Sequence, residues 1–235
     1  MLTAEKSENP IVLSYLALRR AVGAIALGLP FAVSVPWWIF HNHDFESSIS
    51  SYYYTGMRNL FVGCLCAIAM FMLCARGYDR KDEIAGDLAA FCAVGVAFFP
   101  TSPDVGATDL QLRVGIAHYT FAAVLFLTLA YFCLFLFRLT AADKRPTKQK
   151  LQRNQVYVVC GWAILFSVAA ILILHLAKIT LLFGIVRPTF CFETTSLIAF
   201  GIAWLVKGET FLKDHPHSPM RRTTPDIDLG IKDHV

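Results

Sequence analysis

Six long apolar runs, separated by shorter polar stretches, dominate the chain. They lie near residues 21–40, 58–75, 85–101, 114–137, 156–178 and 189–207. A bilayer core of about 30 Å takes roughly 20 helical residues, so each run is long enough, or nearly so, to cross it. The runs are continuously apolar, whereas the strands of a membrane barrel alternate apolar and polar residues. The pattern therefore predicts an all-α polytopic membrane protein with a bundle of six transmembrane helices.

The composition agrees with a membrane protein. Of the 235 residues, 56% are hydrophobic and 16% are charged, whereas a soluble domain usually carries about a quarter charged residues. The net charge of +4 is the one feature that suggests nucleic acid, but basic loops beside a membrane explain it better. We expect membrane lipids as partners and no nucleic acid, and a homo-oligomer stays open. No cleavable signal peptide is expected in residues 1–20.

The basic residues predict the orientation. With a cytoplasmic N-terminus, all but four of the 21 Lys and Arg residues fall on the cytoplasmic side, where positive residues are retained during insertion. The four on the outside are Arg58, Arg113, Lys178 and Arg187. We expect a multi-pass protein of the cytoplasmic (inner) membrane with both termini cytoplasmic and a basic cytoplasmic linker at 141–155. Its parts would be a cytoplasmic N-terminal segment (1–20), a six-helix transmembrane domain (21–208) and a flexible cytoplasmic tail (209–235).

Polar and ionisable residues gather at the outer end of this predicted bundle. A hydroxyl-rich stretch, residues 47–55, fills the first outer loop, and residues 98–118 cross the second. His175 and Glu193 fall in the outer turns of the last two helices. Ionisable groups at membrane depth are costly and normally face a bundle interior or a water-filled cavity. The convergence predicts one polar cavity that opens to the outside.

The residue types in this layer suit nucleophilic catalysis, which needs a nucleophile, a base and a group that orients the base. The candidate catalytic residues are Ser50, Asp104, His118, His175 and Glu193. The candidate substrate-binding residues are Arg58, Tyr53, Ser102 and Arg113, whose two arginines suit a phosphate headgroup. The best hypothesis is a membrane-embedded hydrolase or transferase that acts on lipid at the outer leaflet, although the sequence identifies no reaction.

Several other interpretations stay open. A small-solute or proton-coupled transporter or channel would use Glu193 and the two histidines as titrating groups. A non-catalytic sensor or assembly partner would use the outer loops for docking. The tyrosines alone fit an aromatic belt at the membrane interface. No metal site is predicted from Cys or His spacing and the cofactor is unknown, although haem ligation by His118 and His175 is a minor alternative.

Four short strings carry a family resemblance. They are SISSYYYT at 48–55, FVG at 61–63 after Arg58, GYD at 77–79 and FPT at 99–101. Together they resemble a family of uncharacterised six-helix bacterial membrane proteins over residues 47–120, about a third of the chain. The resemblance implies a six-helix fold and brings no established activity.

A second comparison is with the alkaline-ceramidase and adiponectin-receptor membrane hydrolases. That superfamily is similar in being polytopic and is built around a zinc site of Ser, Asp and three His. Its late HxxxH pair is missing here, because His118 and His175 stand alone in separate helices. Those proteins also typically have seven helices, whereas six are predicted for this chain.

Overall fold

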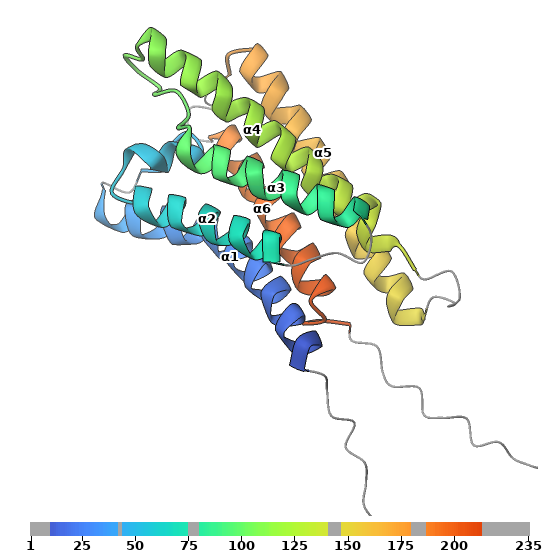
Figure 1. Ribbon diagram of the computed structural model, residues 1–235. Coiled ribbons are helices and arrows are strands. Elements are labelled where there is room, and N and C mark those ends of the chain that lie inside the picture. Colours follow the sequence, from blue (N-terminus) through green and yellow to red (C-terminus); the bar gives the residue numbers. More distant parts are fainter. Residues whose placement is uncertain (1–9, 42–43, 75–79, 141–146, 180–186, 213–235) are drawn as a thin grey trace, which may run out of the picture.

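The computed structural model describes residues 10–41, 44–74, 80–140, 147–179 and 187–212. These residues form α-helices and two short 3₁₀ helices, and no strand occurs among them (Figure 1). The order is α1 (Pro10–Phe40), η1 (Ser50–Tyr54), α2 (Arg58–Cys74), α3 (Arg80–Phe98), α4 (Asp109–Leu134), η2 (Leu136–Arg138), α5 (Lys148–Leu176) and α6 (Pro188–Lys207). The predicted all-α class is confirmed, and each predicted apolar run corresponds to one helix.

Four of the helices are long and apolar enough to cross a membrane. They are Tyr15–Phe40, Asp109–Arg138, Lys148–Leu176 and Pro188–Lys207. The apolar α2 has only 17 residues, and α3 begins with the charged run from Arg80 to Glu83. Length and composition therefore indicate a multi-pass helical membrane protein in which four helices are both long enough and apolar enough to span the bilayer.

The surface of the bundle carries many exposed apolar side chains. Phe91, Ile116, Val159, Phe166 and Ile173 are each about two thirds exposed and come from α3, α4 and α5. Monomeric soluble proteins rarely expose large contiguous apolar patches. Lipid tails are as apolar as these side chains, so the same surface is well matched to a bilayer.

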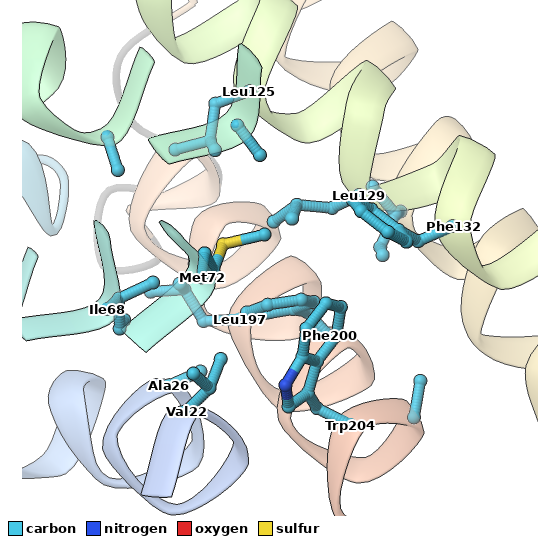
Figure 2. Packing of buried hydrophobic residues seen from close by; sticks show 14 of the residues in the cluster. Val22, Ala26, Ile68, Met72, Leu125, Leu129, Phe132, Leu197, Phe200 and Trp204 are labelled. Carbon is cyan, nitrogen blue, oxygen red and sulfur yellow. The ribbon is translucent and has the colours of Figure 1, made fainter. Parts of the chain in front are cut away.

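The helices pack as a ring in chain order. Each helix contacts the next, α6 returns to pack against α1, and α4 also reaches α6 (Figure 1). Figure 2 shows how α1, α2, α4 and α6 fill the centre with buried side chains such as Val22, Ile68, Leu129 and Phe200. The start of α1 lies beside the end of α6, where the Arg20 Nε donates to the Gly208 carbonyl over 2.8 Å.

Local sequence signals explain where several helices begin. Thr108 caps α4 through a reciprocal capping box with Gln111, and the Thr147 side chain accepts from the Lys150 amide at the start of α5. Pro188 occupies the first turn of α6, where its missing N–H costs nothing. The start of a helix leaves its first amides unpaired. Thr108 and Thr147 each supply an acceptor for one of these amides, and Pro188 has no amide N–H to pair.

Two helices extend beyond the runs that the sequence analysis marked. α1 begins at Pro10, so the expected boundary at residue 20 falls inside this helix. α5 begins at Lys148 and takes in the second half of the predicted linker. The added turns of α5 are polar, so its apolar run marks only part of the helix. The added turns of α1 are mostly apolar, and the run was divided at Arg19 and Arg20, through which the helix continues. The first half of the linker and all but the first residues of the tail lie outside the described residues.

The crossing of α1 and α6 depends on two glycines. A Cβ atom on Gly23 would lie 2.9 Å from the Gly201 carbonyl oxygen. In the same way, a Cβ atom on Gly201 would lie 2.9 Å from the Gly23 carbonyl oxygen. The two backbones are therefore in direct contact. Small residues permit this close approach in membrane helices, where association relies on packing rather than on a hydrophobic driving force.

Changing Gly23 to Ala should destabilise the bundle by about 1–3 kcal/mol, because backbone rather than a flexible side chain must move. The matched control is Gly28→Ala in the same helix, where a Cβ meets nothing within 4 Å and alanine is the better helix former. Thermal unfolding in detergent should show a lower midpoint for the first variant and no decrease for the second. Equal midpoints would show that the helices do not touch at these glycines.

Candidate functional site

The Glu193 side chain connects α6 to the loop between α1 and α2. Its Oε2 accepts hydrogen bonds from the backbone N–H of Ile49 at 2.6 Å and of Ser50 at 3.4 Å. These amides lie at the start of η1, where a helix leaves its N–H groups unpaired. A carboxylate makes charge-assisted bonds to such amides. Glu193 therefore acts as a helix cap that another helix supplies.

The hydroxyl groups of Ser47, Ser48 and Ser51 satisfy one another. The Ser51 hydroxyl lies 2.8 Å from the hydroxyls of both Ser47 and Ser48, and the Ser51 amide donates to the Ser48 hydroxyl over 3.0 Å. The backbone of Ser47 also accepts from the Phe190 amide of α6 at 3.2 Å. Buried polar groups need such partners, and these contacts fold the loop into a compact cap on the bundle.

Two tyrosines of η1 extend this polar layer. Burial raises the pKa of Tyr52 to about 12, so its phenol stays protonated and accepts from the Glu46 amide at 3.5 Å. Tyr54 donates to the Thr101 carbonyl over 2.6 Å, and its pKa is also raised, mainly by burial. The Tyr54 hydroxyl therefore joins the first interhelical loop to the connection between α3 and α4, whereas the Tyr52 hydroxyl bonds within the loop.

The connection between α3 and α4 is held by a second set of contacts. The buried His118 ring donates through Nδ1 to the Phe99 carbonyl at 2.6 Å, just after α3 ends. The Ser102 hydroxyl donates to the Gln111 carbonyl at 3.4 Å and occupies the space that a Cβ on Gly115 would need. His118 and Ser102 therefore fix the loop against α4.

The structure brings together some of the predicted site residues and separates others. Ser50 and Glu193 lie together, because the Ser50 amide donates to the Glu193 carboxylate. Arg58 donates to the Tyr53 hydroxyl, and its guanidinium lies 4.2 Å from the centre of the Tyr53 ring. Asp104, Arg113 and His175 are exposed, although the His175 ring lies 5.5 Å from that of Tyr119. No hydrogen bond among the described residues joins a serine to a histidine.

A small cavity lies beneath η1, between α1, α2, α3, α4 and α6. Its volume is about 40 Å³, and one water needs roughly 10–15 Å³ by the same measure. Ser50 and Glu193 give it a polar edge, and the rest of the wall is apolar. The apolar lining includes Leu29, Phe61, Val96, Leu125 and Leu197, none of which the sequence marks as a site residue. Nothing in a membrane helix distinguishes such residues from other core positions.

A packed apolar layer lies on the other side of this cavity from η1. A second cavity lies near Lys207, at the other end of the bundle. On α2, Ile68 lies between Leu65, which lines the first cavity, and Met72, which lines the second. Leu129 of α4 and Phe200 of α6 occupy the equivalent positions in their helices (Figure 2). All three side chains are buried. The layer therefore separates the η1 end of the bundle from the Lys207 end.

The comparisons with known proteins assign no family. No family model matches the chain, and no curated protein or solved structure matches it. The resemblance to six-helix bacterial membrane proteins therefore stays a prediction. In the described part of the chain, no three His, Cys, Asp or Glu side chains lie close enough to hold a metal ion.

The contact between Glu193 and η1 is tested by amide hydrogen exchange. Changing Glu193 to Ala leaves the amides of Ile49 and Ser50 without their acceptor, so both should exchange at least about tenfold faster, the effect of losing a charge-assisted bond. Glu193→Gln keeps a neutral carbonyl acceptor and should give a smaller increase. The Gln111 amide, which bonds to Thr108 at 3.3 Å, is the internal control. Unchanged exchange at residues 49 and 50 would contradict the assignment.

Proposed function

We propose that the protein is a six-span protein of the cytoplasmic membrane that binds an amphiphilic ligand at the level of the outer leaflet. The observation that carries the proposal is the cavity under η1, whose wall is apolar except for Ser50 and Glu193. Ligand sites are typically apolar cavities with a few placed polar groups. The η1 end faces outwards in this proposal, with both termini in the cytoplasm, because the basic residues favour that orientation.

The chemistry of the cavity restricts the ligand. A carboxylate beside a hydroxyl suits a hydrogen-bond donor, and a cation most of all, because the charges then compensate each other at low dielectric. The small volume of about 40 Å³ accepts a polar group with a short apolar segment rather than a whole lipid. We therefore propose a ligand with an amine or hydroxyl group on an apolar body.

Spanning by α2 and α3 is part of the proposal. At 1.5 Å per residue, their 17 and 19 residues extend about 26 and 28 Å, close to the thickness of a bilayer core. Both helices pack within the ring between α1 and α4. The charged run at the start of α3 would then lie at the cytoplasmic interface.

A lipid hydrolase or transferase is the second candidate. It is favoured by one observation, that Ser50 and Glu193 line the same cavity. Binding is favoured over catalysis because His118, the buried histidine, already bonds to the Phe99 carbonyl. Among the described contacts, the Ser50 hydroxyl has no hydrogen bond to Glu193, which meets Ser50 only through the backbone amide, so no base is placed to activate this hydroxyl.

Transport receives less support from the geometry. A carrier exposes its site alternately to both sides, usually near the bilayer midplane. Here the layer of Ile68, Leu129 and Phe200 is buried and apolar and closes the path between the two cavities. The protein in this arrangement binds its ligand from the η1 end or from the bilayer.

Ligand binding is tested with hexylamine, a soluble chain that ends in an ammonium group. It should raise the thermal midpoint of the purified protein in a neutral detergent, because a ligand that binds only the folded state stabilises it. Hexanoate, its anionic counterpart, should leave the midpoint unchanged. The effect of hexylamine should be lost in Glu193→Gln and kept in Asp109→Asn, which removes an exposed carboxylate near the same end.

A hexylamine effect of equal size in the Glu193→Gln variant would contradict the proposed site. An equal effect of hexanoate would do the same, because it would show that only the apolar chain matters. Turnover of a short-chain ester that disappears in Ser50→Ala, with hexylamine binding retained, would favour the hydrolase.

The orientation is tested with reporter fusions. An alkaline phosphatase inserted in residues 103–107, in the loop before α4, should be active because that loop is external. The same enzyme fused after the C-terminus should be inactive, whereas a fluorescent protein there should mature in the cytoplasm. An external C-terminus would contradict an even number of spans with a cytoplasmic start.

A further inference from the structure

The cavity under η1 is polar at one end and apolar at the other. Its polar lining residues are Ser50 of η1 and Glu193, which lies in the second turn of α6. Helix α2 begins just after η1, and the start of α4 follows the connection to which Tyr54 bonds through the Thr101 carbonyl. Helices α2, α4 and α6 therefore begin at the η1 end, and lining residues further along each of them lie deeper in the bundle.

Three leucines lie at the inner end of the cavity. They are Leu65 on α2, Leu125 on α4 and Leu197 on α6, and on each helix the leucine is the buried lining residue farthest from η1. Leu197 comes four residues after Glu193, and Leu65 comes four residues after Phe61. At 1.5 Å per residue, four residues correspond to about 6 Å of depth. The apolar part of the cavity therefore extends about one helical turn beyond the carboxylate.

The packed apolar layer lies directly beneath these leucines. Its residues Ile68, Leu129 and Phe200 follow the three leucines by three or four positions on the same helices (Figure 2). Each is at most 4% exposed and lines neither cavity. Protein interiors are close-packed, and extra methylene groups in a packed region force its side chains to shift. A bound chain therefore has no space beyond the three leucines unless one of them is shortened.

We propose that Leu65, Leu125 and Leu197 form a floor that determines the length of the apolar segment of the ligand. This inference rests on the function proposed for the cavity. A ligand whose polar group meets Glu193 directs its apolar segment along the cavity, so the end of that segment meets the leucine floor. Each methylene group that reaches the cavity gains burial, whereas a longer segment must displace a packed side chain and binds less well.

The leucine floor is tested with a series of n-alkylamines from butylamine to decylamine, with the matching n-alkanols as uncharged probes. The measured quantity is the ligand concentration that gives half of the maximal rise in the thermal midpoint of the full chain in a neutral detergent. The ratio of this concentration for the octyl and hexyl compounds is determined for each protein. Ligands partition into the detergent equally for every variant, so comparing the ratios between variants removes this effect.

Three variants change the depth of the cavity, and a fourth is the control. Leu125→Ala and Leu65→Ala each shorten a side chain of the floor. Ala122→Val adds volume at a lining position three residues nearer to η1 on α4. Leu136→Ala is the matched control, because Leu136 is 5% exposed, as is Leu65, but lines the cavity at the other end of the bundle.

Leu125→Ala should shift the preference towards the octyl compounds by about tenfold relative to the unsubstituted protein, the gain from burying two further methylene groups. Leu65→Ala should act in the same direction, and Leu136→Ala should leave the preference unchanged. Ala122→Val should shift the preference towards the butyl compounds, because it fills part of the cavity. The opposite effects of Leu65→Ala and Ala122→Val keep the test decisive if Leu125→Ala does not fold.

The experiment distinguishes failure of the floor from failure of the proposed function. An unchanged length preference in both alanine variants of the floor, with hexylamine binding that still requires Glu193, would overturn the floor and leave the proposed function intact. A shifted preference with equal hexylamine binding in Glu193→Gln would contradict the proposed function and support the floor. A shift of equal size in Leu136→Ala would overturn the floor, and no stabilisation by either series would overturn both.

Discussion

The contact between the Glu193 carboxylate and the amides of Ile49 and Ser50 determines the architecture of the η1 end. Backbone N–H groups near the hydrocarbon cannot rely on water for partners, so a 3₁₀ helix there needs an acceptor from the protein itself. The ion pair of Arg187 with Asp44, at 3.1 Å, and the bond from Phe190 to Ser47 hold the same loop to the start of α6. The roof of the cavity and the placement of Ser50 both follow from this attachment.

The helices and the polar layer were predictable from the sequence, because apolar runs and clustered hydroxyls are local features. The contacts within the layer were not, because they join residues far apart in the chain. Glu193 was noted as an ionisable residue at membrane depth, but its partners lie more than 140 residues earlier. His118 was a candidate base, and only the structure shows its bond to the end of α3. The first turns of α5 were assigned to a linker because they are polar, although the helix continues through them.

The two ends of the bundle have opposite chemistry. The η1 end holds a carboxylate that accepts from backbone donors, whereas at the Lys207 end the ammonium groups of Lys150 and Lys207 both donate to the Phe137 carbonyl. The buried layer of Ile68, Leu129 and Phe200 keeps them apart. This layer separates the two cavities, and the close crossing at Gly23 and Gly201 leaves α1 and α6 little freedom to separate.

The arrangement is tested most directly by a cryo-electron microscopy map of the full chain in lipid nanodiscs, with a bound antibody fragment as a size marker. The map should show all six helices within the bilayer density and η1 seated on α6, with the Glu193 carboxylate at hydrogen-bond distance from the amides of Ile49 and Ser50. A map in which η1 is detached from α6, or in which α2 and α3 lie outside the bilayer, would contradict it.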